Sequence, residues 1–410
     1  MKRSEINKAL KELEAMCAKY KCYLPPFCNF TPEEWQEKGH EYDEVRDCML
    51  GWDITDYGLG NFDKFGFSLI TIRNGCRTQP EKYPKVYAEK LLYLKEGQMA
   101  ANHFHWFKTE DIINRGGGMS TFLGVYDQFP DRCLDMPIAE SGFTHFGNGA
   151  ALAGMRPIVD LMFSDFSALA FDAIVNGAAK FRFNSQGEAC VPIVYVMANG
   201  GRGAYTGGVG SGCNHSQCVE GWFQNIPGLK IVAPYYPSDA LGLLKASIRD
   251  DDPVLFLYAE GSLGVREAVP EEMEPIPLHH AAKIMREGTD LTIVAVQAMV
   301  PTALKAVEEL EKAGISAELI DPRVLIPLDL EKITASVRKT RRLLVVHEAP
   351  SRGGIGAEIL SAVTQEALRD MKAARVLGAK NIPVGSGFAE SLIIPQVEDV
   401  VRAAREVIAQ

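Results

Sequence analysis

Short apolar runs alternate with helices rich in small residues in the second part of this 410-residue chain. Three such runs are RPIVDLMF (156–163), VPIVYVMA (191–198) and LKIVAP (229–234). The helix-like stretch SALAFDAIVNGAAKF (167–181) lies between the first two. Strands that are apolar throughout are typical of parallel sheets with helices on both faces. The pattern therefore predicts an α/β fold that begins near residue 119.

A second α/β unit follows a stretch rich in Pro and Glu, VPEEMEPIPLHH (269–280), which is typical of a linker. Both units are expected to contain mainly parallel sheets. The elements predicted after the linker are strands at 291–296, 316–321 and 343–348 and helices near 299–313, 355–370 and the C-terminus.

Residues 1–118 have a different pattern, with a charged helix followed by strand-like segments. FGFSLITIRNG (65–75) and KVYAEKLLYLKEGQ (85–98) alternate apolar and polar residues, which indicates antiparallel β structure. The sequence therefore predicts a multidomain protein in three parts, which are 1–118, 119–270 and 281–410.

Composition narrows the class of protein. The formal net charge is −10 and no Lys/Arg cluster is present, so we expect no nucleic-acid partner. No run approaches the ~20 apolar residues of a membrane helix, and the N-terminus lacks the apolar core of a secretory signal. Nine cysteines at irregular spacing favour reduced thiols over a disulfide framework. We expect a cytoplasmic protein that acts on a small molecule.

Two histidines in HFHWFKTE are the first candidate site. His103 and His105 are two residues apart, so on a strand both imidazoles face the same side. Glu110 adds a carboxylate, and this ligand set suits Mn, Fe, Zn or Ni. The alternative is a pair of partly exposed strand histidines without a metal.

The stretch from Gly97 to Gly117 reads G-x5-H-x-H-x4-E-x6-G and resembles the first metal motif of the cupin β-barrels. Residues 1–118 as a whole resemble the N-terminal part of the cupin D-lyxose isomerases, which implies half a cupin barrel. That resemblance implies a metal-dependent aldose–ketose isomerase that uses Mn²⁺ or another divalent cation. Cupins take a fourth ligand, a histidine, from a later motif that this chain lacks. The stretches that carry the isomerase resemblance are WDITDYGLGNF (52–62), IRNG (72–75), YAEKLLYLKEGQ (87–98) and HFHWFKTEDIINRGGG (103–118).

Residues 119–410 resemble the beta subunit of the thiamine-dependent 2-oxo acid dehydrogenases of the pyruvate, branched-chain and acetoin type. The resemblance implies a transketolase-like pyrimidine-binding domain at 119–270, without its first helix and strand, and a transketolase C-terminal-like domain at 281–410. The motifs are DMPIAESGF (135–143), GAALAGMRPIVDLMFSDF (149–166), HSQCVEGWFQNIPGLKIVAP (215–234), DDPVLFLY (251–258), IDPRVLIPLD (320–329) and EAPSRGGIGAEI (348–359).

This resemblance assigns roles to three residues. Glu140 matches the carboxylate that hydrogen-bonds the aminopyrimidine of thiamine diphosphate and helps to deprotonate its thiazolium carbon. Phe166 matches an aromatic ring that packs on the pyrimidine, and His215 matches the histidine that faces the substrate and supplies a proton. Cys213 and Cys218 flank His215, and the alternative of a metal site there lacks a second pair of ligands.

The diphosphate end of the cofactor needs Mg²⁺ held by a GDG-type motif, and this chain has no GDG. The resemblance implies that an alpha subunit supplies Mg²⁺ in an α₂β₂ heterotetramer and that a lipoyl acyltransferase core accepts the acyl group. The loop at 198–214 is longer than the family usually has and carries Asn214 where Gln is common. Substrate choice is therefore expected to differ.

The sequence favours a dehydrogenase beta subunit, because 119–410 keeps nearly all of its family's motifs; the alternatives are a metal-dependent D-lyxose-type isomerase and an inactive fusion of the two. The glycine run Gly116–Gly118 is not followed by Lys-Ser/Thr, so it lacks the phosphate-loop pattern. We interpret the run as a junction at which two coding sequences were joined.

Overall fold

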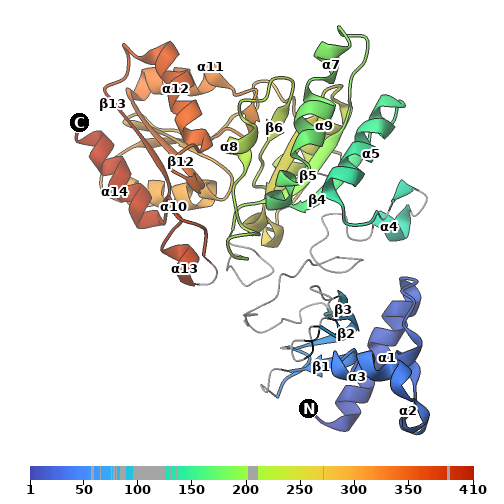
Figure 1. Ribbon diagram of the computed structural model, residues 1–410. Coiled ribbons are helices and arrows are strands. Elements are labelled where there is room, and N and C mark those ends of the chain that lie inside the picture. Colours follow the sequence, from blue (N-terminus) through green and yellow to red (C-terminus); the bar gives the residue numbers. More distant parts are fainter. Residues whose placement is uncertain are drawn as a thin grey trace. The chain divides into compact units, whose positions relative to one another are not determined.

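The computed structural model describes residues 1–56, 60–64, 66–74, 76, 79, 81–83, 89–95, 125–129, 132–134, 136–201, 211–270, 272–385 and 388–410 (Figure 1). Two compact units divide the chain, Met1–Asp135 and Met136–Gln410. The expected boundary at 118/119 and the glycine run lie outside the described residues. Within the part of the chain that is described, no helix is both long and apolar enough to cross a bilayer.

An antiparallel sheet forms the centre of the first unit, as the alternating pattern predicts. Its strands are β1 (Gly51–Thr55), β2 (Phe67–Arg73) and β3 (Glu89–Tyr93), in the order β1-β2-β3. The indole N–H of Trp52 in β1 donates to the carbonyl of Cys28 at 2.7 Å, which ties the sheet to the chain before it. The sheet is consistent with part of a cupin-like domain.

The N-terminal helix α1 (Arg3–Lys19) buries one face because Ala9, Leu13 and Cys17 recur every four residues. Leu13 and Cys17 pack with Ile70 of β2. Burial raises the pKa of Cys17 to about 11, so its thiol stays protonated at neutral pH. All nine cysteines lie in the described part of the chain, and none of them forms a disulfide bond. The short helices of this unit are η1 (Pro26–Asn29), α2 (Pro32–Glu37), η2 (His40–Tyr42), α3 (Asp43–Asp47) and α4 (Val125–Gln128).

The first sheet of the second unit has the order β11-β6-β7-β5-β4, and its four strands from β6 to β4 are parallel. Every residue of the central strands β5 and β7 is buried, as the apolar runs predict. The strands are β4 (Ile158–Phe163), β5 (Val194–Asn199), β6 (Lys230–Val232), β7 (Val254–Ala259) and β11 (Val324–Ile326). The helices are α5 (Glu140–Leu152), η4 (Ser164–Ala168), α6 (Phe171–Ile174), η5 (Val175–Ala179), α7 (Phe181–Asn184), α8 (Glu220–Phe223), α9 (Pro237–Arg249) and η7 (Glu260–Gly264).

Strand β11 comes from the sequence after the linker, yet it pairs antiparallel with β6. Val324 lies opposite Val232 in this pairing, and both are fully buried. The C-terminal sequence therefore supplies the last strand of the first sheet.

The second sheet has the order β13-β12-β9-β10-β8, and β8 alone runs antiparallel to its neighbour. Adjacent residues of β9 face opposite sides, since Ile293 packs with α10 and α14 whereas Val294 packs with α11 and α12. The strands are β8 (Lys283–Arg286), β9 (Leu291–Ala295), β10 (Ala317–Asp321), β12 (Arg342–Pro350) and β13 (Ala373–Ala379). The helices are α10 (Met299–Lys312), α11 (Leu330–Thr340), α12 (Ile355–Ala367), α13 (Phe388–Ser391) and α14 (Val397–Ile408).

One hydrophobic core continues from the first sheet to the second. Ile193 beside β5 and Val345 of β12 belong to the same buried cluster, with Ile355 of α12. Figure 1 shows the two sheets of this unit next to each other, each covered by helices. The predicted pair of α/β domains with mainly parallel sheets is confirmed.

The helix expected over 167–181 is divided into η4, α6, a π-helical turn at η5 and α7. The side-chain amide of Asn148 donates to the carbonyl of Ala173 at 2.8 Å from the neighbouring helix α5. This bond gives the carbonyl a partner outside its own helix, which is a physical reason for the change of helix type that apolar spacing cannot predict.

Gly228 is a position where both backbone conformation and space require glycine. Its φ is +89°, and a Cβ there would lie 2.0 Å from the carbonyl oxygen of Ala179. Gly187 has nearly the same φ, +88°, but nothing lies within 4 Å of its Cβ position. We predict that Gly228→Ala lowers the free energy of unfolding by about 3 kcal/mol or more, and Gly187→Ala by about 1 kcal/mol.

Urea unfolding followed by circular dichroism measures both variants. The pair separates the close contact from the strained φ, because the two glycines share the same backbone conformation. Equal losses in the two variants would contradict the role of the Ala179 contact.

Candidate active site

The carboxyl end of β4 and the turn η4 form one wall of the candidate site. The strand bulges just before its end, where Met162 has a φ of +61° and its N–H donates to Asp160 Oδ1 at 2.8 Å. Bulges of this kind change the direction of the side chains that follow. Phe163 and Phe166 come next, with ring centroids 6.0 Å apart and an interplanar angle of 86°.

His215 lies against this aromatic pair. Its imidazole is 4.7 Å from the Phe163 ring and 5.3 Å from the Phe166 ring, and both contacts are edge-to-face. The sequence predicted His215 and Phe166 as site residues from motifs 49 positions apart (215 − 166), and the structure brings them together. Phe163 was not predicted as a site residue.

Glu140 is the first residue of α5, a helix that contacts β4. Its side chain is half-buried, and within the described residues its carboxylate has no hydrogen-bond or ion-pair partner. The positive end of the helix dipole favours a negative charge at this position. Among those residues, no hydrogen bond joins Glu140 to Phe166 or His215, so its predicted role stays a prediction.

Asn199, the last residue of β5, is the centre of a buried hydrogen-bond network. The network lies behind the loop that carries His215, of which residues 211–219 are described (the His215 loop). Its Oδ1 accepts from the N–H of Val219 at 3.0 Å. Its Nδ2 donates to Glu220 Oε2 at 3.1 Å and to Gln297 Oε1 at 2.7 Å. Gln297 in turn donates to the carbonyl of Leu257 at 2.7 Å. Since Gln297 lies in the turn that follows β9 of the second sheet, the network joins both sheets to the loop.

Several buried carboxyl groups surround this loop. Glu220 and Glu260 are 1% and 0% exposed, and burial raises the pKa of each, that of Glu260 to about 7. Ser211 donates to Glu260 Oε1 at 3.1 Å, whereas Glu260 Oε2 has no hydrogen-bond partner in the described part of the chain. Glu348 Oε1 accepts from the N–H of Gly201 at 2.6 Å.

The predicted metal ligands and the alternative metal site at His215 have different outcomes. His103, His105 and Glu110 lie outside the described residues, so the cupin-type site stays a prediction. For the residues that the structure describes, no group of three His, Cys, Asp or Glu side chains is placed to hold a metal ion. Cys213, His215 and Cys218 are all described, so the alternative of a metal site there is not supported. Burial raises the pKa of the Cys218 thiol well above its usual value.

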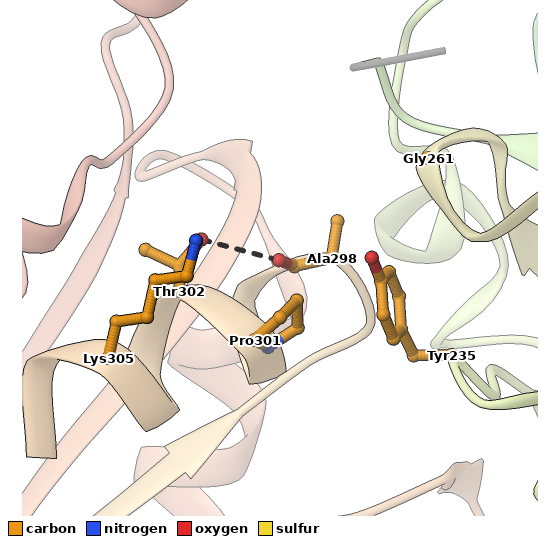
Figure 2. Close-up of a pocket in the computed structure, with 6 residues that line it drawn as sticks. All are labelled: Tyr235, Gly261, Ala298, Pro301, Thr302 and Lys305. Atoms are coloured by element: carbon orange, nitrogen blue, oxygen red, sulfur yellow. Dashed lines mark hydrogen bonds between the residues drawn. The ribbon is translucent and has the colours of Figure 1, made fainter. Parts of the chain in front are cut away.

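A pocket of about 210 Å³ lies between the turn after β6, η7 and the start of α10 (Figure 2). Its polar groups include the ammonium of Lys305 and the hydroxyl of Thr302, which donates to the carbonyl of Ala298 at 3.5 Å. The volume is below the 300–1,000 Å³ or so that is usual for ligand pockets. None of its lining residues was predicted from the sequence.

Sequence reasoning missed the polar residues that support the His215 loop, above all Asn199, Glu220 and Glu260. Asn199 ends β5 and Glu260 directly follows β7, two strands that are otherwise apolar and buried, whereas Glu220 begins α8. Polar residues at the carboxyl ends of parallel strands gather at one edge of the sheet, where α/β proteins bind ligands. That rule, applied to the ends of 191–198 and 251–258, is the signal that was available.

We predict that Asn199→Asp lowers the free energy of unfolding by about 3 kcal/mol or more at pH 8. The new carboxylate would face Glu220 Oε2 and Gln297 Oε1, both acceptors, in a buried place. Asn381→Asp is the matched control, because the Asn381 side chain accepts from the N–H of Arg352 and a carboxylate also accepts. Chemical unfolding checks both, and equal stability of the two variants would disprove the effect.

The raised pKa of Glu260 predicts how stability depends on pH. A carboxyl whose pKa rises on folding, here from 4.5 to about 7, stabilises the folded state below its unfolded pKa and loses this contribution as pH rises through 7. Glu260→Gln should therefore gain about 3 kcal/mol relative to the unmodified chain between pH 4.5 and pH 8. Exposed Glu188→Gln is the control. A pH-independent difference in unfolding free energy would refute this account.

Three family descriptions match the chain. Residues 1–140 match D-lyxose isomerase, residues 98–265 match the transketolase pyrimidine-binding domain, and residues 280–400 match the transketolase C-terminal domain. The solved structure of a split-gene transketolase, described as an inactive beta4 tetramer, shares the fold with a TM-score of 0.58 and 22% identity. That match covers 71% of this chain and 90% of the other.

Two curated relatives are similar over most of their length. The pyruvate dehydrogenase E1 component subunit beta-1 of Oryza sativa is 42% identical over 77% of this chain and 85% of its own length. The acetoin:2,6-dichlorophenolindophenol oxidoreductase subunit beta of Cupriavidus necator is 41% identical over 71% and 85%, respectively. At this identity and coverage, the chain belongs to the family of pyruvate dehydrogenase E1 component beta subunits.

Proposed function

We propose that this chain is the beta subunit of a 2-oxo acid dehydrogenase and contributes the aminopyrimidine half of a thiamine diphosphate site. The observation that carries the proposal is the edge-to-face packing of His215 on Phe163 and Phe166 at the carboxyl end of a parallel sheet. In α/β proteins, this edge is the place where ligands bind.

The residues present fit the aminopyrimidine group. Phe166 is half-buried, so part of its ring remains open for a flat heterocycle to pack on. The Glu140 carboxylate has no partner among the described residues and can share a hydrogen bond with a ring nitrogen. When bound, thiamine diphosphate supplies the electron sink for decarboxylation of a 2-oxo acid. His215 would then donate a proton or stabilise negative charge on the substrate.

The diphosphate end of the cofactor would be held elsewhere, since the sequence lacks a GDG motif. Relatives named as beta subunits indicate an alpha partner. We propose that this partner supplies Mg²⁺ in an α₂β₂ heterotetramer and that a lipoyl acyltransferase core accepts the acyl group. The cytoplasmic location stays a prediction, and the identity of the 2-oxo acid is open.

The match of residues 1–140 to D-lyxose isomerase favours a second candidate function, metal-dependent aldose–ketose isomerisation. Its ligands would be His103, His105 and Glu110, with Mn²⁺ or another divalent cation. Residues of the antiparallel sheet are described, whereas these ligands are not. An inactive fusion of the two families is the remaining alternative.

We predict that Glu140→Gln lowers the rate of 2-oxo acid decarboxylation at least about 100-fold in the reconstituted alpha–beta complex, because the amide cannot share the proton. The assay measures reduction of an artificial electron acceptor with added thiamine diphosphate and Mg²⁺. Glu188→Gln is the matched control and should keep full activity, because Glu188 is exposed and its side chain has no partner among the described residues.

Metal analysis and an aldose–ketose assay on the unmodified chain distinguish the candidates. Stoichiometric Mn or Zn with sugar isomerisation, and no turnover that depends on thiamine diphosphate, would overturn the dehydrogenase proposal. Loss of the isomerisation in His103→Ala would then assign it to the N-terminal segment.

A further inference from the structure

Gln217, two residues after His215, is fixed by four hydrogen bonds. Its Nε2 donates to Asp165 Oδ1 at 2.7 Å and its backbone N–H donates to Asp165 Oδ2 at 3.4 Å. Its carbonyl accepts from the hydroxyl of Ser164 at 3.1 Å and from the N–H of Gly200 at 3.0 Å. The His215 loop is therefore attached to the ends of both β4 and β5.

Four consecutive residues at the end of β4 hold the His215 loop in place. The outer two, Phe163 and Phe166, contact the imidazole of His215. The inner two, Ser164 and Asp165, hold Gln217. One short segment thus determines the position of the ring and of the backbone that carries it.

The charge of Asp165 has a second effect. Asp165 is 9% exposed, and burial raises its pKa, while the two hydrogen bonds from Gln217 and the nearby His215 oppose that rise. The attraction between the two charges is mutual. A protonated His215 stabilises the ionised form of Asp165, and the Asp165 carboxylate equally stabilises the protonated form of His215. A neutral side chain at 165 would satisfy Gln217 Nε2 without this interaction.

Several described ionisable groups that interact with Asp165 are acidic. Asp165 contributes to the raised pKa of Cys218 in the loop and of Glu260 after β7. Glu348 and Glu390 also act on both of these groups. Among the described residues, the charged group that acts on Asp165 is the basic His215. Within this part of the chain, the pair Asp165–His215 is an attraction beside several acidic groups.

We propose that Asp165 is a positioning residue for His215. Through Gln217 it fixes the loop, and its negative charge keeps the imidazole protonated at a higher pH than the loop alone would. The catalytic consequence rests on the proposed function, in which His215 supplies a proton to the substrate. The effect on the His215 ring does not depend on that function.

Two variants separate position from charge. Asp165→Asn removes the charge and keeps an oxygen acceptor for Gln217 Nε2, although the longer bond from the Gln217 N–H to Oδ2 is lost. Gln217→Leu keeps the charge and removes the side-chain contact. Glu188→Gln is the control for an exposed carboxylate, and Glu260→Gln tests another buried acid, which lies after β7 and interacts with Asp165. The urea midpoint and circular dichroism confirm that each variant is folded.

The first readout is the NMR titration of the His215 ring in the full-length chain with labelled histidine. We expect Asp165→Asn to lower its midpoint by at least about half a pH unit, and Gln217→Leu to leave it within a few tenths. An unchanged midpoint in folded Asp165→Asn would overturn the proposal, whether or not the chain is a dehydrogenase.

The second readout is the rate of the reconstituted complex against pH. The alkaline limb of kcat/KM, where the protonated imidazole is lost, should move to lower pH in Asp165→Asn by the same amount as the NMR midpoint, whereas Gln217→Leu should lower kcat about tenfold with an unchanged limb. A unit shift of the limb corresponds to a tenfold change in the protonated fraction. If the unmodified complex has no activity with 2-oxo acids while the NMR shift is present, the proposed function fails and the role of Asp165 in setting the protonation of His215 stands.

Discussion

The buried hydrogen bonds of Asn199 are the interaction on which the architecture of the second unit depends most. One carboxamide joins three segments: the end of β5, the loop that carries His215, and the turn after β9 that contains Gln297. Buried amides must have their donors and acceptors satisfied, so each of these segments is restricted to one arrangement. The hydrophobic core from Ile193 to Ile355 also holds these parts together, but apolar contacts do not depend on orientation. The hydrogen bonds of Asn199 do depend on orientation, so they fix how the parts are arranged.

The fold was predictable where burial was uniform. The apolar runs at 191–198 and 291–296 match β5 and β9. A strand that is covered on both faces is apolar at nearly every position, so it can be recognised as a continuous apolar run. The amphipathic helices α10 and α14 were predicted for a different reason, because their buried positions recur with helical spacing. The segment 167–181 was predicted to be helical and is so, but its division into several helix types was not predicted; there the carboxamide of Asn148 bonds the carbonyl of Ala173 from outside the helix.

The site was predictable only as far as single motifs reach. Phe166 and His215 were predicted from a family resemblance, whereas the contact between their rings is seen only in the folded structure. Gln217 stands in the same motif as His215, but its bonds to Asp165 depend on how the strand ends are placed relative to the loop. Periodicity carries no information about such contacts. The metal ligands predicted in the N-terminal segment lie outside the described residues, and their arrangement stays a prediction.

Strand β11 has a consequence for how this chain can be divided. Residues Val324–Ile326 leave the second sheet's sequence to complete the first sheet, beside Val232. A cut in the linker at 269–280 would break the covalent connection, yet the two fragments would remain associated, as in a protein whose halves exchange a strand. The two α/β domains, although separate families by sequence, are in this respect a single folding unit, and neither is expected to be well formed when it is expressed alone.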